Sequence, residues 1–270
     1  MAPLRKNSSM FHSLMGFARA MPRKSVYEVI KLVYRVTAAT GLYEAIKSAG
    51  TGEYTPYYPY GYATYSPWFQ SPFQNIYRKI RSRSLVSEDR GYIINRLCLH
   101  SLRLEGDFAE CGVYKGGSAF LIASTIKQYI DKGRSLHLFD TFTGMPDTAV
   151  KERDGHTKGD IGDTSLEEVN EYLKGFSFIE FHPGFIPDTF KEVTSKQFCF
   201  VHIDVDIYQS TLDCYRFFYD RVVPGGILLC DDYGFPTYKN AAKAAVDQFF
   251  SNKPEAPIVL PTGQCLVIKL

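Results

Sequence analysis

The sequence lacks the features that mark several large classes of protein. Its 270 residues contain no apolar run close to the roughly 18 residues that a membrane-spanning helix needs, so we expect no membrane span. The 31 Lys and Arg residues almost balance the 29 Asp and Glu residues, which leaves a net charge of +2. Such a charge provides no general field for holding a nucleic-acid backbone. Nucleic acid is therefore not an expected partner.

Closely spaced cysteine pairs are also absent. The 6 cysteines are scattered, mostly within apolar runs, and none has the spacing of a cysteine zinc site. We interpret them as buried, reduced thiols of a cytoplasmic protein. The basic residues 1–24 contain no continuous apolar segment and no clear cleavage site. We expect them to form an amphipathic arm that contacts other subunits of a homo-oligomer, with weak binding to a membrane surface as the alternative.

Two segments precede a regular alternation of strands and helices. Residues 25–49 place apolar side chains at helical intervals. Residues 50–68 are rich in Tyr, Pro and Gly and predict an ordered aromatic loop or lid, which either lines an acceptor pocket or packs against the body or a partner subunit. We therefore divide the chain into an N-terminal helical and aromatic-loop arm, residues 1–80, and a second domain, residues 81–270.

The second domain predicts an α/β fold. A helical stretch at 84–104 is followed by short apolar runs that alternate with amphipathic stretches. This order predicts a mostly parallel sheet with helices on both faces. The last two strands are joined only by the sequence PTGQ, too short for a crossover helix, so they should form an antiparallel hairpin at one edge. Strands are expected at 107–113, 135–141, 176–184, 198–206, 225–232, 256–260 and 265–270, and helices at about 117–131, 165–174, 187–195, 209–221 and 237–251.

A glycine-rich turn follows the first of these strands. In an open parallel sheet, ligands bind beyond the carboxyl ends of the strands, and glycines there let the backbone approach a ligand closely. The spacing Gly-x-x-x-Gly-Gly differs from the Gly-x-Gly-x-x-Gly of a dinucleotide site and has no Walker lysine. Such a turn could equally serve only to pack a helix on a strand. The candidate ligand-binding residues of this turn are Glu110, Gly112, Gly116, Gly117 and Ser118.

The next two strands deliver further candidates at the same edge. Asp140 ends the second strand, and a carboxylate at that place suits a ribose diol because it can accept two hydroxyl hydrogen bonds. A solvated aspartate at a strand end is the alternative interpretation. Gly184 and Phe185 follow the third strand and could border a purine ring.

Carboxylates are concentrated at the ends of the fourth and fifth strands. Asp204 and Asp206 lie two residues apart and so point the same way from an extended chain, while Asp231 and Asp232 end the next strand. If the two strands are neighbours, these like charges stay ionised together only with a divalent cation or basic partners. Hard oxygen donors favour Mg²⁺ or a similar ion. The alternative is a polar turn in which only one acid is functional.

Five stretches, taken together and in this order, resemble one known family. The sequences GDFAECGVYKGGSA, LFDTFTGMPD, GFIPDTF, HIDVDIYQST and VPGGILLCDDYG are similar to the TylF/MycF/NovP family of macrocin-type O-methyltransferases, over roughly residues 80–250. The resemblance implies a class I methyltransferase fold, S-adenosylmethionine as cofactor and Mg²⁺ dependence. It also implies, as substrate, a hydroxyl of a sugar or glycosylated small molecule of the natural-product type.

Carried over residue by residue, the resemblance implies roles for particular side chains. The cofactor would contact the glycine-rich turn and the ends of the next two strands, and the acceptor hydroxyl would lose its proton to Asp204, with Asp206 as the alternate base. His202 stands where several relatives carry Arg. The implied cofactor-binding residues are Glu110, Gly112, Tyr114, Gly116, Gly117, Ser118, Asp140, Thr141 and Gly184, and the implied metal ligands are Asp204, Asp231 and Asp232.

Other functions fit the sequence less closely. A catechol-type acceptor suits the same metal geometry because its hydroxyls are vicinal. A nicotinamide-dependent oxidoreductase is disfavoured by the missing dinucleotide fingerprint, and a non-catalytic interaction protein on the same fold is disfavoured by the intact acidic positions. Residues 84–90 could fold over the cofactor, or could simply begin a helix with Ser87 as its N-cap.

Overall fold

The computed structural model describes residues 65–129, 133–147 and 150–270. The predicted N-terminal arm, the helix at 25–49 and most of the aromatic loop lie outside these ranges. The chain divides into two units between Tyr65 and Ser66. Residues 73–80, which the sequence pattern groups with the arm, form a helix that contacts the helices of the second unit. The division at 80/81 stays a prediction for the arm itself.

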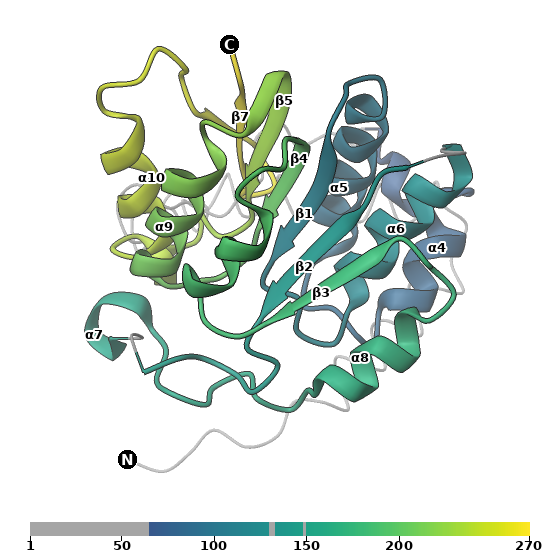
Figure 1. Ribbon diagram of the computed structural model, residues 1–270, viewed down its shortest axis with the longest axis horizontal. Helices are drawn as coiled ribbons and strands as arrows, with labels where there is room; N and C mark the ends of the chain where they lie inside the picture. Colours follow the sequence, from purple (N-terminus) through teal and green to yellow (C-terminus); the bar gives the residue numbers. More distant parts are fainter. Residues whose placement is uncertain (1–64, 130–132, 148–149) are drawn as a thin grey trace, which may run out of the picture. The chain divides into compact units, whose positions relative to one another are not determined.

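The described residues form one mixed sheet at the centre of the second unit (Figure 1). Its strand order is β3-β2-β1-β4-β5-β7-β6. Strands β1 to β5 pair in parallel, whereas β7 runs antiparallel to both β5 and β6. The predicted α/β class and the antiparallel hairpin at the edge are both confirmed. The strands are β1 (Asp107–Cys111), β2 (Leu136–Asp140), β3 (Ile179–Pro183), β4 (Phe198–Ile203), β5 (Val222–Cys230), β6 (Ile258–Val259) and β7 (Cys265–Ile268).

Helices cover both faces of the sheet, as Figure 1 shows. One face packs against α4, α5, α6 and α8, and the other packs against α9 and α10. This double cover explains why every residue of β4 is buried and why its sequence is almost continuously apolar. The helices are α4 (Phe73–Ile80), α5 (Glu88–Ser101), α6 (Gly117–Tyr129), α7 (Lys151–Asp154), α8 (Leu166–Leu173), α9 (Tyr208–Phe218) and α10 (Ala242–Phe250), with 3-10 turns η1 (Pro67–Phe69), η2 (Asp188–Val193) and η3 (Pro236–Tyr238).

Several of the expected elements differ in the structure. The helix expected at 187–195 is the shorter 3-10 helix η2. The predicted helix at 237–251 is split into η3 and α10, because Ala241 (φ −107°, ψ −105°) interrupts the helical backbone between them. Strand β5 begins earlier than expected, at Val222. Its Pro-Gly-Gly segment, which suggests a turn, is instead an irregularity within the strand, where the register with β4 shifts and Gly225 has φ +81°. Strands β4 and β5 also end earlier than expected, at Ile203 and Cys230, so the four aspartates lie in the loops directly beyond them and not in the extended strands.

The strand order creates a crevice at one end of the sheet. From β1 the chain proceeds outward to β2 and β3, and then crosses back to β4 on the other side of β1. Ligands of open α/β sheets bind outside the carboxyl ends of the strands at such a reversal. Among the described residues, no helix combines the length and the apolarity that crossing a bilayer requires.

The C-terminal strand is held by one buried carboxylate. Glu255 accepts hydrogen bonds from the Tyr219 hydroxyl at 2.7 Å and from Lys269 Nζ at 2.7 Å. Burial raises the pKa of Glu255, but the bonds from Lys269 and Tyr219 outweigh it and lower the pKa to about 2. Because the folded state holds the proton less tightly than the unfolded chain, this stabilisation is present above about pH 4.5 and is lost as the pH falls toward 2.

We expect Glu255→Gln to lower the free energy of unfolding by about 1–3 kcal/mol at neutral pH, because a neutral amide loses the charge-assisted bond from Lys269. The difference from wild type should narrow as the pH falls toward 2. Urea unfolding at several pH values measures it, with the exposed Glu105→Gln as the matched control. A pH-independent difference between the two variants would contradict this role of the Glu255 charge.

Candidate active site

A pocket of about 300 Å³ occupies the crevice at the carboxyl ends of β1, β2, β4 and β5. It brings together residues from most of the motifs that the sequence singled out. Residues of the 84–90 segment also border it, and Ser87 stands at the N-cap position of α5 without a side-chain cap hydrogen bond, so both interpretations of this segment stay open. The candidate site residues that line the pocket are Gly112, Tyr114, Ser118, Asp140, Thr141, Gly184, Asp204, Asp206 and Asp232, together with Phe185.

The first turn of the site depends on a close approach between two strands. A Cβ on Gly112, which has φ +86°, would lie 1.8 Å from the carbonyl oxygen of Asp204. Only glycine therefore lets the ends of β1 and β4 come this close. Gly112 thus acts by placing Asp204 as well as by bordering the pocket.

Gly116 and Gly117 are not among the residues that line the pocket. A Cβ on Gly117 would lie 2.7 Å from the carbonyl oxygen of Arg83, and one on Gly116 would lie 3.0 Å from Val169 Cγ1. These glycines therefore seat the start of α6 against the 83–84 segment and α8, which matches the packing alternative. Tyr114 and Ser118, which the sequence analysis also predicts as cofactor-binding residues, do line the pocket.

Asp140 fastens the loop that forms the pocket wall. Its Oδ2 accepts hydrogen bonds from the backbone N–H groups of Val113 at 2.6 Å and Tyr114 at 2.9 Å, and its Oδ1 accepts one from Phe142 at 2.7 Å. The carboxylate is half-buried and still borders the pocket. A carboxylate has about four lone-pair positions. The three backbone bonds, with Thr141 Oγ1 a further 3.5 Å from Oδ1, leave Asp140 room for about one bond from a ribose hydroxyl.

Tyr114 lies in a backbone conformation that L-residues seldom adopt, with φ +50°. Hydrogen bonds of its side chain and of its backbone hold Tyr114 in this conformation. Its hydroxyl donates to Asp163 Oδ1 at 2.8 Å, and its carbonyl oxygen accepts a bond from Thr164 Oγ1 at 2.6 Å. The Asp140 carboxylate holds its N–H group. Strained residues held in this way cluster at ligand sites.

Asp204, Asp206 and Asp232 form the carboxylate cluster of the site, with one oxygen of each within 4.8 Å of the others. Asp206 has φ +58°, which turns its side chain back toward this cluster. Burial, followed by the charge of Asp231, raises the pKa of Asp204 to about 8. Burial and the neighbouring Asp206 and Asp204 also raise the pKa of Asp232. Three acids this close disfavour one another's charged forms.

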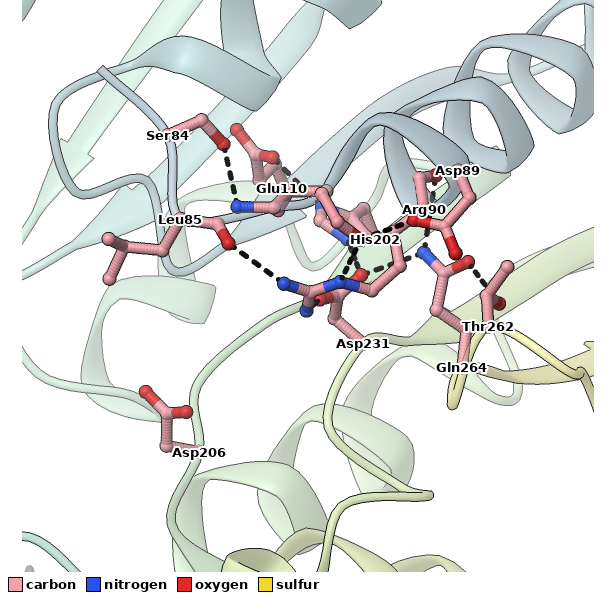
Figure 2. Close-up of polar contacts among 12 residues, drawn as sticks. Ser84, Leu85, Asp89, Arg90, Glu110, His202, Asp206, Asp231, Thr262 and Gln264 are labelled. Atoms are coloured by element: carbon pink, nitrogen blue, oxygen red, sulfur yellow. Dashed lines mark hydrogen bonds and ion pairs between the residues drawn. The ribbon is translucent and has the colours of Figure 1, made fainter. Parts of the chain in front are cut away.

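Asp231 does not belong to the carboxylate cluster. Its side chain accepts a bond from Gln264 Nε2 at 2.7 Å, forms an ion pair with Arg90, and lies 3.5 Å from His202 Nε2 (Figure 2). In the same view Asp206 stands apart from this network. The predicted set of ligands therefore differs from the observed cluster, in which Asp206 takes the place of Asp231. The physical reason is that basic and amide donors already surround the fully buried Asp231 carboxylate.

A buried histidine links this network to the first strand. His202 Nδ1 lies 2.9 Å from Glu110 Oε1, and both side chains are fully buried. Burial lowers the pKa of His202, but its bonds to Asp231 and Glu110 outweigh that effect and raise the pKa to about 10. The imidazolium thus neutralises two buried acids. Glu110, which we predicted to contact the cofactor, is absent from the pocket lining.

The sequence analysis did not name three further side chains of the site. Arg90 and Tyr238 line the pocket from α5 and η3, and His156 lies 4.0 Å from Asp206 and 3.1 Å from the Tyr238 hydroxyl. Arg90 and His156 come from segments far from the strand ends in the sequence, whereas Tyr238 lies eight residues beyond the end of β5. The basic residue within 84–90 is the only hint, because that segment is expected to fold over a ligand.

The carboxylate cluster fits a divalent cation. Asp232 Oδ2 is buried and has no hydrogen-bond partner among the described residues. The donor set consists of carboxylate oxygens, which Mg²⁺ prefers over zinc. A cation bound by these three acids would relieve their mutual repulsion. The residues present are therefore compatible with the metal that the sequence resemblance implies.

The other end of the pocket fits a nucleoside. The half-exposed Phe185 borders it together with Met145 and Ile186, which provides apolar surface for a ring close to the Asp140 carboxylate. Apolar walls with a few directed polar groups are typical of cofactor pockets. The pocket therefore offers a place for adenine and ribose beside the acidic cluster.

A pocket at the reversal point of this seven-stranded sheet, with its antiparallel C-terminal strands, defines the Rossmann-like fold of class I methyltransferases. Residues 96–259 match the family described as Macrocin-O-methyltransferase (TylF). This match covers more than half of the chain, and the protein belongs to that family. The resemblance noted from the five sequence stretches is thereby confirmed.

Individual relatives agree with this placement. The chain is 27% identical over 146 residues to the 8-demethyl-8-(2,3-dimethoxy-alpha-L-rhamnosyl)-tetracenomycin-C 4'-O-methyltransferase of Streptomyces olivaceus, which covers 50% of this chain and 56% of that protein. It is 28% identical over 148 residues to the mycinamicin III 3''-O-methyltransferase of Micromonospora griseorubida, and this match covers 50% of this chain and 58% of that protein. The matches thus span little more than half the length of these relatives.

A solved structure shows the same fold. The O-methyltransferase NovP superimposes with a TM-score of 0.61 at 22% identity, over 69% of this chain and 82% of that one. Calicheamicin methyltransferase CalS11 superimposes with a TM-score of 0.57 at 16% identity, over 74% and 93%. At these identities the likeness supports the fold alone.

We expect Asp140→Asn to weaken binding of S-adenosylhomocysteine by about 1–3 kcal/mol, because an amide cannot accept from both the loop N–H groups and a ribose diol. Calorimetric titration measures the affinity, with the exposed Asp188→Asn as control. A 2'-deoxyribose analogue separates a direct contact from a disturbed loop. If Asp140 contacts the diol, wild type binds the analogue more weakly than S-adenosylhomocysteine. The difference in affinity between the two ligands should then be smaller for Asp140→Asn. An equal loss of affinity in both proteins would show that the ribose binds away from Asp140.

Proposed function

We propose that this protein transfers the methyl group of S-adenosylmethionine to a hydroxyl of a sugar or glycosylated small molecule, with the help of a divalent cation. The observation that carries the proposal is the cluster of Asp204, Asp206 and Asp232 inside the pocket of a TylF-family chain. The relatives named above act, by their names, on glycosylated molecules. That substrate class is proposed for this chain on those grounds.

The chain's own residues divide the work within the pocket. Asp140, the 113–114 loop and the apolar wall near Phe185 would hold the nucleoside. Asp204, Asp206 and Asp232 would hold the cation, and a bound divalent cation lowers the pKa of a hydroxyl that contacts it. S-adenosylmethionine supplies an electrophilic methyl group, so the protein mainly has to align donor and acceptor. One of the two carboxylates Asp204 and Asp206 accepts the hydroxyl proton.

The reaction needs little more from the protein than this alignment and one base. Asp206 and Asp204 have different surroundings in the pocket. The Asp206 side chain is 13% exposed and lies near His156 at the pocket wall, whereas Asp204 is placed by the Gly112 turn. Asp204→Asn and Asp206→Asn are therefore compared at saturating Mg²⁺, with Mg²⁺ affinity measured for each, and the base is the residue whose variant loses turnover while its cation site is still filled.

The first test is calorimetric titration of the purified protein with S-adenosylmethionine and S-adenosylhomocysteine, with Mg²⁺ and with chelator. We expect binding of both ligands, followed by methyl uptake when glycosylated acceptors are screened with labelled cofactor. Methyl uptake only by catechols would change the substrate class. Failure of the folded protein to bind either ligand under any metal condition would refute the methyltransferase proposal and favour an interaction protein.

The ligand set of the cation is tested separately. Mg²⁺ titrations should show weaker binding in Asp206→Asn and Asp232→Asn than in wild type. Asp231→Asn tests the ligand role that the resemblance implies for Asp231. If that variant binds Mg²⁺ like wild type, Asp231 acts through Arg90 and His202. A homo-oligomer is also part of the proposal, and light scattering of the full chain measures it.

A further inference from the structure

A second group of possible metal ligands lies on β2 and β3. His137 is paired with Glu180, and Phe139 with His182, in the parallel register of these strands. Side chains two residues apart in a strand point to the same face, so both histidines and Glu180 project together. One ligand atom from each lies within 4.8 Å of the others. None of the three residues lines the pocket described above.

The outer nitrogen of each imidazole faces a carboxylate. His137 Nε2 lies 3.2 Å from Asp107 Oδ2, and His182 Nδ1 lies 2.5 Å from Glu192 Oε2. A carboxylate can only accept, so each of these nitrogens carries the N–H. Carboxylate-oriented imidazoles of this kind are the usual arrangement around metal-binding histidines.

The inner nitrogens, His137 Nδ1 and His182 Nε2, consequently both lack a hydrogen atom and face each other. His137 Nδ1 and His182 Nε2 lie 3.0 Å apart, and both histidines are buried. With both outer nitrogens protonated, two neutral imidazoles would point lone pairs at each other. Something positive must lie between them, either a shared proton or a metal ion.

We propose that His137, His182 and Glu180 bind a Zn²⁺ ion or a similar transition metal. Ligands at about 2.0–2.2 Å from a tetrahedral zinc lie roughly 3.3–3.6 Å from one another. His137 Nδ1 is 3.5 Å from Glu180 Oε2, within this range, and the two nitrogens are 3.0 Å apart, a few tenths of an ångström below it. Two imidazoles and one carboxylate, with a fourth position for water, are an established zinc donor set.

The surroundings suit such an ion. The Glu180 side chain is 46% exposed, which gives the ion a path from solvent, while the imidazoles are buried and already oriented. Asp107 also lies 3.3 Å from Lys196 Nζ, so its charge is partly balanced. Strand β3 is the edge of the sheet and is only partly buried. The metal would therefore fasten the edge strand to β2, with Asp107 of β1 and Glu192 of η2 as supports.

The test uses chelator-treated full-length protein in excess Mg²⁺, added to fill the cation site proposed at the carboxylate cluster. We expect Co²⁺ to give the visible absorption of a tetrahedral site, Zn²⁺ to displace it, and X-ray absorption of the zinc form to show two imidazole ligands. Zinc binding should also raise the melting temperature. Glu180→Gln should weaken zinc binding at least tenfold, and His182→Gln should weaken it further.

Controls separate this site from the catalytic one. The exposed Glu167→Gln on α8 should bind zinc like wild type, and so should Asp232→Asn, because neither residue belongs to the proposed site. Glu180→Gln removes an exposed charge and should stay folded, which circular dichroism checks. Absence of zinc binding in wild type would overturn the proposal and leave a shared proton between the imidazoles. Undiminished binding in Glu180→Gln and His182→Gln would overturn it as well. These readouts do not depend on methyl transfer.

Discussion

Asp204→Asn is expected to lower the turnover number by roughly 10²–10⁴-fold, the usual contribution of a positioned acid–base group. Asp204 sits at the centre of the site, because the Gly112 turn brings the end of β1 against its backbone. The substitution keeps the volume of the side chain and removes its charge from the cluster. Affinity for S-adenosylhomocysteine should stay close to that of wild type, since the cofactor contacts that we propose lie on Asp140 and its loop and not on Asp204.

Two measurements make this prediction specific. Steady-state methyl transfer gives the turnover number, and calorimetry with S-adenosylhomocysteine gives the affinity. The exposed Asp220→Asn is the matched control and should behave like wild type in both. Because Asn removes one of several neighbouring like charges, the variant should be no less stable than wild type in chelator. Turnover by Asp204→Asn at the wild-type rate would remove Asp204 from the mechanism.

His202→Leu is expected to lower the free energy of unfolding by about 3–5 kcal/mol. Leucine has a similar size but cannot donate, so Glu110 would be left buried without its cationic partner. Asp231 would keep Arg90 and Gln264. The loss comes from the uncompensated charge, because replacing a buried ion pair as a whole is often close to neutral.

Urea unfolding at pH 7 measures this effect. The exposed His100→Gln on α5 is the control and should lie close to wild type. The double variant Glu110→Gln/His202→Leu should recover part of the loss, because it removes the unpaired charge as well. A loss below about 1 kcal/mol in the single variant is the size expected for an exposed ion pair. Such a result would contradict the role of the buried His202 imidazolium.

Much of the fold follows from local patterns. Continuous apolar runs such as Phe198–Ile203 predict strands buried on both faces, and alternation with amphipathic stretches predicts a parallel sheet. The short connection PTGQ predicts the antiparallel hairpin. Boundaries are less predictable where a turn signal is overridden. The Pro-Gly-Gly segment of β5 is an irregularity in the strand because pairing with β4 satisfies the backbone on both sides of it.

The position of the acidic site is also partly predictable from local sequence patterns. Aspartates at the carboxyl ends of neighbouring parallel strands must lie at one edge, so the sequence alone groups Asp204, Asp206, Asp231 and Asp232. Their division into two environments is not predictable in this way. It depends on Arg90 from α5 and Gln264 from the C-terminal hairpin, which the fold brings to Asp231 across 141 and 33 residues of sequence.

By itself, therefore, the sequence determined the class of sheet, the edge at which the pocket and its carboxylates lie, and the family, because these follow from hydrophobic periodicity and from motifs that are local in the chain. Only the tertiary structure decided which carboxylates share a pocket, that Gly116 and Gly117 pack a helix, and that His137 and His182 face each other. Such features depend on side chains from distant segments meeting within a few ångströms. Their distances arise from packing, which no local pattern encodes.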